Sequence, residues 1–343
     1  MDLFHLTAGA STANEIWGPM EKYPFLLGPN AAGFAHLFFG TSQPLNLLIG
    51  HLSTRVLYGR LDQSRYSTVQ GSKYYSLPDE PGRIRFASGL LADFQPAGMT
   101  GLDVGFGRFI QSIWPPSGIP PSFLRKPFRA FLKADLSPTF DKTLAGLDNE
   151  LASAFFRWAL PRSGVEVYGE YGREDHSYDY RDFAQEPDHQ RSYGLGIRKV
   201  LQRSDTSLSG FRAELINFQE PALARTGRGE GSIYIHGSIR QGQTNRGQLL
   251  GAPVGVRAAA GSTVAYDHYL PSGHWAVKWE RTVRQETDSS SDVLQALGFE
   301  RTRFGRRLDV RWEVTLMRDL NRNYSGDATN LNLAVTLSRP AHK

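Results

Sequence analysis

The clearest pattern in the sequence is a strict alternation of apolar and polar positions over residues 308–318. One face collects the apolar side chains Leu308, Val310, Trp312, Val314 and Leu316. The other face collects Asp309, Arg311, Glu313 and Thr315. A period of two is that of a β-strand. In a soluble β-sandwich the apolar face would point to a core, whereas in a membrane barrel it points to lipid and the charged face lines a wet lumen.

The same pattern predicts an all-β chain of about fourteen strands, an even number as expected of a bacterial membrane barrel. The segments are short, rich in β-branched and aromatic residues, and bounded by Gly, Pro, Asp and Ser. They cover residues 3–10, 33–41, 47–60, 83–91, 100–110, 153–160, 165–171, 191–201, 208–217, 261–270, 274–284, 291–301, 308–318 and 329–338.

Several of these strands carry charge on one face only. Lys278 and Glu280 share one face of their strand, and Glu166 and Glu170 share one face of theirs. In a barrel these faces would line the lumen, where rows of opposite charges are common. The candidate lumen-lining residues are Glu166, Glu170, Lys278, Glu280, Asp309, Arg311 and Glu313.

The connections between the strands differ in length. Residues 111–152, 172–190 and 218–260 are long. Pro161–Gly164, Gln202–Ser207, Pro271–Gly273 and Thr302–Arg307 are short. Alternation of short turns and long loops is typical of a meander through a membrane. If residues 218–260 form one connection without a membrane strand, every short turn lies on the same side of the membrane as the C-terminus. A membrane strand at Ser232–Ile239 would break this arrangement, so that apolar stretch is predicted to fold against or into the barrel mouth.

The composition excludes several classes of protein. Without cysteine the chain has neither disulfides nor thiolate metal sites. A mean hydropathy of −0.39 and the absence of a long apolar run exclude a transmembrane helix but leave a transmembrane barrel open. A net charge of +5, with Arg interspersed among Glu and Asp, gives no basic patch for nucleic acid.

The sequences of the two ends of the chain bear on whether the protein is exported and inserted into a membrane. The first residues lack a charged segment followed by an apolar run and a cleavage site, so no signal peptide is predicted. The alternation from Leu3 to Ala8 indicates that the chain starts inside a strand, which favours a missing beginning over a cytosolic protein. The last residues, 337–343, lack a terminal aromatic residue of the kind that outer-membrane insertion machinery often recognises.

Four segments resemble the capsule assembly protein Wzi family, and they follow its order along most of the chain. Residues 14–36, with Trp17-Gly18-Pro19 and Pro29-Asn30-Ala31-Ala32, resemble its Trp-Gly-Pro and Ser-Asn-Asn-Ala segment. Residues 50–64, with Tyr58-Gly59-Arg60-Leu61, fit the strand that follows there. His236 with 241–251 is similar to its Gly-x-Thr-x-Arg-Gly-x-x-Leu-Gly signature, and Trp279-Glu280-Arg281 resembles a late Tyr-Glu-Arg strand.

This resemblance implies an antiparallel β-barrel of the bacterial outer membrane with long extracellular loops. The family barrel has about eighteen strands and a small helical region toward the periplasm, so residues 1–343 would form a single barrel domain whose N-terminal strands and signal peptide are missing. The family is described as a lectin-like anchor for capsular polysaccharide. The implied partners are a capsular or other surface polysaccharide and outer-membrane lipid, with a monomeric barrel and no nucleic acid.

The candidate polysaccharide-binding residues combine aromatic rings with hydrogen-bonding groups. They are Trp17, Asn30, Arg173, Asp175, His176, Tyr178, Tyr180, Arg181, His236, Thr244 and Arg246. Each has a structural alternative. Trp17 could be buried beside a turn, residues 172–190 could be a solvated loop, and Arg246 could tie a constriction to the barrel wall. The Pro-rich stretch 114–127 is a lid, a plug or a plain surface loop.

Neither a cofactor nor a metal is expected, and the chain is not expected to be an enzyme. Asp175, His176 and Asp179 match no defined metal cage. Gly227–Gly229 and Gly242–Gly247 lack the Lys-Ser/Thr ending of a P-loop. Paired carboxylates such as Glu166 and Glu170 could serve glycoside hydrolysis but are ordinary lumen lining in a wet barrel.

Three functions remain open from the sequence. The leading one is a non-catalytic outer-membrane barrel that binds or anchors surface polysaccharide through weak, repeated contacts. The second is a porin-like channel for small polar solutes, which a steady conductance would distinguish. The third is a soluble all-β protein that binds or cleaves glycans, which would dissolve without detergent.

Overall fold

In the computed structural model, most of the chain forms one antiparallel sheet. The structure describes residues 2–64, 84–130, 148–174, 179–219, 233–236, 239, 241–287 and 290–340. Within them the sheet has 16 strands. They are β1 (Asp2–Leu3), β2 (Leu6–Ser11), β3 (His36–Thr41), β4 (Leu45–Leu47), β5 (Gly50–Asp62), β6 (Ile84–Pro96), β7 (Leu102–Ile113), β8 (Asn149–Leu160), β9 (Val165–Glu174), β10 (Arg191–Arg203), β11 (Leu208–Asn217), β14 (Ala259–Leu270), β15 (Gly273–Thr287), β16 (Ser290–Arg303), β17 (Asp309–Arg322) and β18 (Gly326–Ser338).

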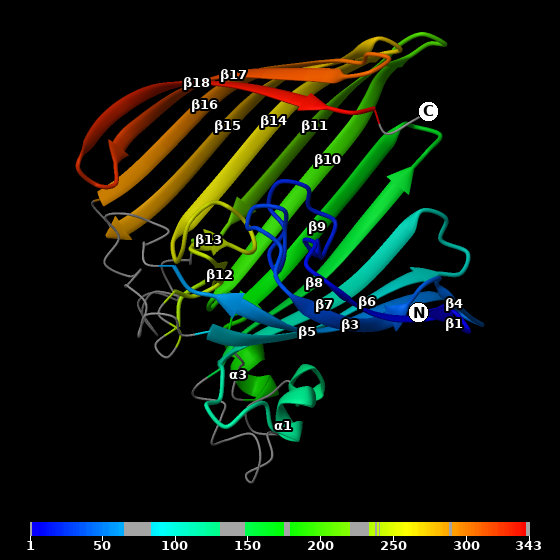
Figure 1. The fold of residues 1–343 in the computed structure, drawn as a ribbon, viewed down its shortest axis with the longest axis vertical. Helices are drawn as coiled ribbons and strands as arrows, with labels where there is room; N and C mark the ends of the chain where they lie inside the picture. The colour runs from blue at the N-terminus through cyan, green and yellow to red at the C-terminus, as the bar shows by residue number, and fades with distance from the viewer. Residues whose placement is uncertain are drawn as a thin grey trace.

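The strands follow one another as a meander. Each pairs antiparallel with the next along the path from β1 to β18, while β4 pairs with β5 beside that path. Figure 1 shows the sheet curving around a concave interior, with long tilted strands along its wall. Each of the fourteen predicted segments overlaps at least one of these strands, so the predicted all-β barrel fold is confirmed. The sheet has more strands than predicted because 3–10 spans β1 and β2, and 47–60 overlaps both β4 and β5.

The turns divide the molecule into two sides. Residues 161–164, 204–207, 271–272 and 304–308, and the end of β18, lie on one side, which is called the short-turn side below. This confirms the predicted position of the short turns relative to the C-terminus. The opposite, long-loop side carries the connections 12–35, 63–83, 114–148, 175–190 and 218–258. On the same side, β15 and β16 pair out to Thr287 and Ser290, and the connection 323–325 joins β17 to β18, so long connections do not continue around the whole rim.

The outer face of the sheet is apolar and exposed. On β18, Leu333 and Val335 have 69% and 71% of their surface accessible, and Trp312 and Leu316 of β17 also point outward. The charged residues between them, such as Glu313, lie on the concave face. An apolar outside and a charged inside are the arrangement expected of a membrane barrel rather than of a soluble sandwich.

Two connections fold back into the concave interior. The first inward segment is residues 12–35, between β2 and β3, and the second is the described part of residues 233–257, between β11 and β14. The second contains the hairpin of β12 (Thr244–Asn245) and β13 (Gln248–Leu249), and both segments are visible inside the barrel in Figure 1. The prediction that the stretch 232–239 folds into the barrel is supported by Ile233 and Tyr234, which are fully buried.

The buried apolar core therefore lies inside the barrel. It combines residues of both inward segments with inward-facing wall residues such as Leu57, Phe109 and Ile216. Glycines in the wall allow this close packing, because a Cβ at Gly89 would lie only 2.6 Å from Trp17 Cη2. The two inward segments and their core thus occupy part of the interior.

Within the residues that the structure describes, helical structure lies on the long-loop side. The helix α1 (Pro121–Leu124) and the 3-10 helix η1 (Lys126–Phe128) follow β7, and α3 (Tyr180–Gln185) follows β9. Among the helices in the described ranges, none is long and apolar enough to cross a membrane.

Candidate functional site

Wall carboxylates hold the first inward segment by its backbone. Glu214 of β11 accepts hydrogen bonds from the N–H groups of Glu21 at 2.7 Å and Lys22 at 2.8 Å, and from the Tyr168 hydroxyl at 2.7 Å. Glu170 of β9 accepts one from the N–H of Phe25 at 3.0 Å. Both carboxylates are buried. Because a buried N–H without a partner is costly, these bonds fix the position of the segment in the lumen.

Glu15 ties the start of the same segment to the wall. Its carboxylate forms an ion pair with Arg55 of β5 and lies 3.1 Å from His36 Nε2. Burial alone raises the pKa of Glu15, but the hydrogen bonds from His36, Arg55 and Trp17 outweigh it and lower that pKa to about 2. Glu15 is therefore expected to stay ionised through most of the acid range.

This ion pair predicts a specific acid sensitivity. Because the folded-state pKa of about 2 lies below the ordinary value of 4.5, the stabilisation is complete above pH 4.5 and is lost as pH falls toward 2. The contribution is at most about 3 kcal/mol. Glu15→Gln should thus lose less stability than the wild type between pH 5 and 3, measured as the denaturant midpoint in detergent. Parallel declines in the two proteins would contradict this assignment.

Arg85 of β6 holds the second inward segment. Its guanidinium is 1% exposed and donates to the backbone oxygens of Gly242 and Thr244 and to the Gln111 side chain at 2.7 Å. Gln111 in turn contacts Gln243, whose amide donates to the Leu26 carbonyl at 2.8 Å. A continuous series of hydrogen bonds thus links the wall to the second inward segment and that segment to the first.

Aromatic rings join the two inward segments. Phe25 stacks on Tyr234 with ring centroids 5.6 Å apart, and Phe218 packs edge-on against both. The Tyr234 hydroxyl donates to the Phe25 carbonyl and accepts from the Ala252 N–H. Together these contacts make the two segments one plug, defined here as residues 12–35 and the described part of 233–257.

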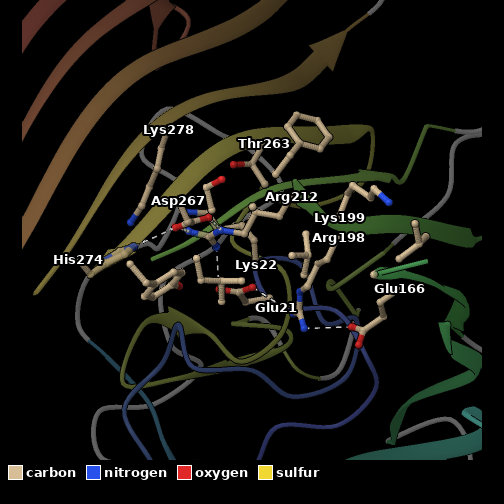
Figure 2. A pocket seen from close by; sticks show the side chains of 18 of the residues that line it. Glu21, Lys22, Glu166, Arg198, Lys199, Arg212, Thr263, Asp267, His274 and Lys278 are labelled. Carbon is tan, nitrogen blue, oxygen red and sulfur yellow. Dashed lines mark hydrogen bonds and ion pairs between the residues drawn. The ribbon is translucent and has the colours of Figure 1, made fainter. Parts of the chain in front are cut away.

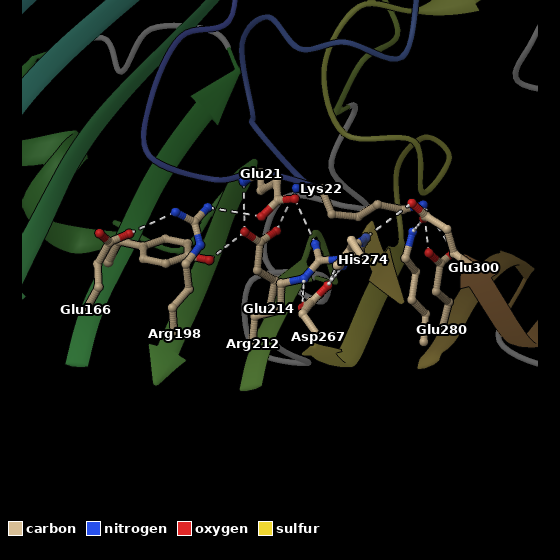
Figure 3. A network of polar contacts seen from close by, with 12 residues as sticks. Glu21, Lys22, Glu166, Arg198, Arg212, Glu214, Asp267, His274, Glu280 and Glu300 are labelled. Carbon is tan, nitrogen blue, oxygen red and sulfur yellow. Dashed lines mark hydrogen bonds and ion pairs between the residues drawn. The ribbon is translucent and has the colours of Figure 1, made fainter. Parts of the chain in front are cut away.

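On the short-turn side of the plug lies an open recess of about 970 Å³ lined by charged side chains (Figure 2). The cations include Lys22, Arg198 and Arg212, and each is paired with a carboxylate. Arg198 and Arg212 both bind the Glu21 carboxylate, at 3.1 and 2.7 Å (Figure 3). The network continues along the wall through Asp267, His274, Lys278, Glu300 and Arg311.

A second, buried ion-pair cluster supports the long-loop side. Lys126 of η1 binds Asp148, and Arg129 binds both Asp148 and Glu150. Burial lowers the pKa of Lys126 although Asp148 opposes this. The Pro-rich stretch 114–127 is thereby fixed to the start of β8, as an ordered loop on the rim.

The structure places several predicted glycan-binding residues inside the plug. Trp17 is 1% exposed and packs edge-on against Phe109, so its ring offers no face to a sugar here. Thr244 is fully buried, and its backbone oxygen and hydroxyl both accept from Arg85. His236 pairs with Ile239 in an isolated bridge. Trp17 thus has the buried position that was its structural alternative.

Arg246 and Asn30 lie at the edge of the plug. Arg246 and Gly247 both have positive φ, as in a two-residue hairpin turn, and the Arg246 side chain lies 3.4 Å from Asp62 of β5. Arg246 thus ties the constriction to the wall, while its side chain stays 64% exposed. Asn30 donates to the Leu249 carbonyl at 2.8 Å and lines a smaller recess of about 310 Å³.

The candidates in 172–190 lie on the long-loop side. Tyr180 is 74% exposed and Arg181 is also exposed, both on α3. Arg173 at the end of β9 lies over the ring of Phe183, 5.1 Å from its centroid. Asp175, His176 and Tyr178 lie outside the described residues. Arg173 therefore contacts α3, the helix that carries Tyr180 and Arg181 on the long-loop side.

The predicted lumen residues face the concave side. Glu166 binds Arg157 and Arg198, Glu170 binds the plug, Lys278 binds Glu300 and Glu280 binds Lys22. Arg311 binds Glu300 and Glu313, and Asp309 accepts from the Gly305 N–H. Sequence patterns did not single out Arg85, Arg198, Arg212 or Glu214. The alternation along each strand predicts that these residues lie on its polar face. It does not predict their partners, several of which come from loops distant in sequence.

Within the described ranges, no group of three or more His, Asp or Glu side chains could hold a metal ion. The polar groups of the site are instead used in ion pairs and in bonds to backbone.

No family model matches the sequence, and no curated protein matches it. Among solved structures, the chain is similar to Wzi, an outer membrane protein involved in group 1 capsule assembly in Escherichia coli, with a TM-score of 0.66 at 15% identity. The superposition covers 98% of this chain and 66% of that one.

The chain has the fold of an outer-membrane β-barrel. It spans 66% of the length of the Wzi structure, and that protein is a carbohydrate-binding β-barrel. Weaker similarities link it to a BenF-like porin from Pseudomonas fluorescens Pf-5, at TM-score 0.37 and 12% identity over 90% of this chain and 78% of that one. OprD from Pseudomonas aeruginosa follows, at TM-score 0.36 and 11% identity over 88% of each chain.

Proposed function

We propose that this chain is a Wzi-like barrel of the bacterial outer membrane that binds surface polysaccharide and does not conduct solutes. The observation that carries this proposal is the plug. Two inward segments are packed on each other through aromatic rings and held to the wall by buried carboxylates and by Arg85. A barrel whose interior holds a plug with its own apolar core is suited to hold a ligand at its rim rather than to pass one through its lumen.

The rim offers suitable chemistry for a glycan on the long-loop side. Tyr180 and Arg181 are exposed on α3, close in sequence to Arg173 and Phe183. Aromatic rings pack on the apolar faces of sugars, and guanidinium groups bind hydroxyl and carboxylate oxygens. Each contact is weak, but a repeating polymer gives avidity through many of them. No bond-making step is assigned to any residue, so the proposed activity is non-catalytic.

Conductance tests the proposal against the porin reading. The purified protein, inserted in planar bilayers, should give no steady open-channel current. A large and steady current would overturn the anchor reading and favour a channel for small polar solutes. Extraction tests the remaining alternative, because a chain that dissolves without detergent would be neither kind of membrane barrel.

Binding to polysaccharide should depend on α3. The double variant Tyr180→Ala/Arg181→Ala is expected to weaken binding of the host's own surface polysaccharide by about three- to tenfold, because two exposed contacts of modest energy are lost. Surface plasmon resonance with immobilised polysaccharide would measure this.

The matched control is Arg203→Ala, which removes an exposed charge at the end of β10 on the short-turn side. If both variants bind as the wild type does, α3 takes no part in glycan binding.

A further inference from the structure

Arg198 and Arg212 form an unusual pair on the barrel wall. They are direct register partners across β10 and β11, and both side chains reach into the recess. Two like charges directly opposite each other on neighbouring strands destabilise a sheet. An anion between them removes the repulsion, and two guanidinium groups around one carboxylate form strong charge-assisted hydrogen bonds.

The anion between these arginines comes from the plug. Glu21 Oε2 lies 3.1 Å from Arg198 Nη2, and Glu21 Oε1 lies 2.7 Å from Arg212 Nη1 (Figure 3). Each arginine keeps a second carboxylate on the wall, Glu166 for Arg198 and Asp267 for Arg212. The wall carboxylates orient the guanidinium groups, and Glu21 fills the space between them.

The Glu21 carboxylate can leave without releasing the plug. Its side chain is 48% exposed to the recess, whereas its backbone N–H is held separately by the buried Glu214. The neighbouring Lys22 is fixed both by Glu214 and by Glu280. Rotation of one half-exposed side chain is therefore enough to empty the space between the arginines.

We propose that Arg198 and Arg212 form a binding site for the carboxylate of a ligand that enters from the short-turn side, and that Glu21 is its built-in competitor. The recess of about 970 Å³ has room for a sugar acid beside the arginine pair. Tyr269 and His274, stacked with ring centroids 4.3 Å apart, give it an aromatic wall. This inference does not depend on polysaccharide binding at the long-loop rim.

The test removes the competitor and measures binding of defined probes. Glu21→Gln keeps the size of the side chain but loses its charge, so glucuronate should bind at least about tenfold more tightly to this variant than to the wild type. Glucose, which has no carboxylate, should not gain. Isothermal titration calorimetry in detergent would measure both. Adding Arg198→Gln and Arg212→Gln to the Glu21→Gln variant should abolish the gain.

The matched control is Glu280→Gln, which raises the charge of the same recess by one unit without freeing the arginine pair. An equal gain for glucuronate in this control, or no gain in Glu21→Gln, would overturn the proposal. Acetate distinguishes the source of the carboxylate. If acetate gains as much as glucuronate, the site recognises the carboxylate alone, and a larger gain for glucuronate means that the sugar ring adds contacts. Heat-modifiable gel migration verifies that each variant is folded.

Discussion

Replacing Glu214 by alanine is expected to open the barrel to ions. Glu214 accepts three hydrogen bonds, two from the plug backbone at Glu21 and Lys22 and one from Tyr168. Hydrogen bonds to a charged, buried acceptor contribute about 1.5–3 kcal/mol each, and the two N–H groups left behind would be unpaired. We expect a loss of about 3–5 kcal/mol in the free energy of unfolding.

Because the lost bonds belong to the plug, the loss should appear as plug release before the barrel unfolds. Planar-bilayer recordings should therefore show current steps that the wild type lacks, while heat-modifiable migration persists. The matched control is Glu313→Ala, which removes a lumen carboxylate whose ion-pair partner among the described residues is the half-exposed Arg311. Exposed pairs contribute less than about 1 kcal/mol, so this control should stay closed. A closed Glu214→Ala barrel would show that the plug does not depend on this carboxylate.

Replacing Arg85 by alanine should have the second large effect. The guanidinium is almost completely buried and donates to the backbone of the second inward segment at Gly242 and Thr244. Removing one side of a buried, charged network commonly costs about 3–5 kcal/mol, because the remaining acceptors lose their partner in a dry site. The measurement is the guanidinium chloride concentration at the midpoint of unfolding of the purified barrel in detergent.

Arg60→Ala is the control for this experiment. Arg60 lies on the adjacent strand β5 and is 54% exposed, and its ion-pair partner in the described part of the chain is Asp62. Its removal should change the free energy of unfolding by less than about 0.5 kcal/mol. Equal destabilisation of the two variants would mean that the contacts of Arg85 with the plug contribute nothing specific.

The wall of the barrel could be predicted from the sequence because its signal is local. Residues 308–318 carry their period of two within one strand, and β17 is found there with Trp312 outward and Glu313 inward. The register follows from the same alternation, since a shift by one residue would place Glu313 in the outer face. The turns at 161–164 and 204–207 could also be predicted, because only short polar stretches separate the neighbouring strands there.

The plug could not be predicted in the same way because its contacts are distant in sequence. Trp17 and Tyr234 have no periodic pattern around them, and Phe25 meets Tyr234 across 209 residues. In a Gly- and Pro-rich stretch, the sequence is equally compatible with an aromatic side chain that is exposed to bind a sugar and with one that is buried. Only the three-dimensional arrangement, in which Gly89 makes room for the Trp17 ring, distinguishes these two readings.

The short connections on the long-loop side have a consequence for the shape of ligand that the rim can accept. β15 and β16 pair out to Thr287 and Ser290, and only residues 323–325 connect β17 to β18, whereas the longest connections cluster over β5–β14. A rim with tall loops all around would admit a polymer only by its end. For the polysaccharide ligand proposed above, a rim with one low side lets the polymer lie across it without presenting an end, so recognition can occur in mid-chain and at many repeats of the same molecule.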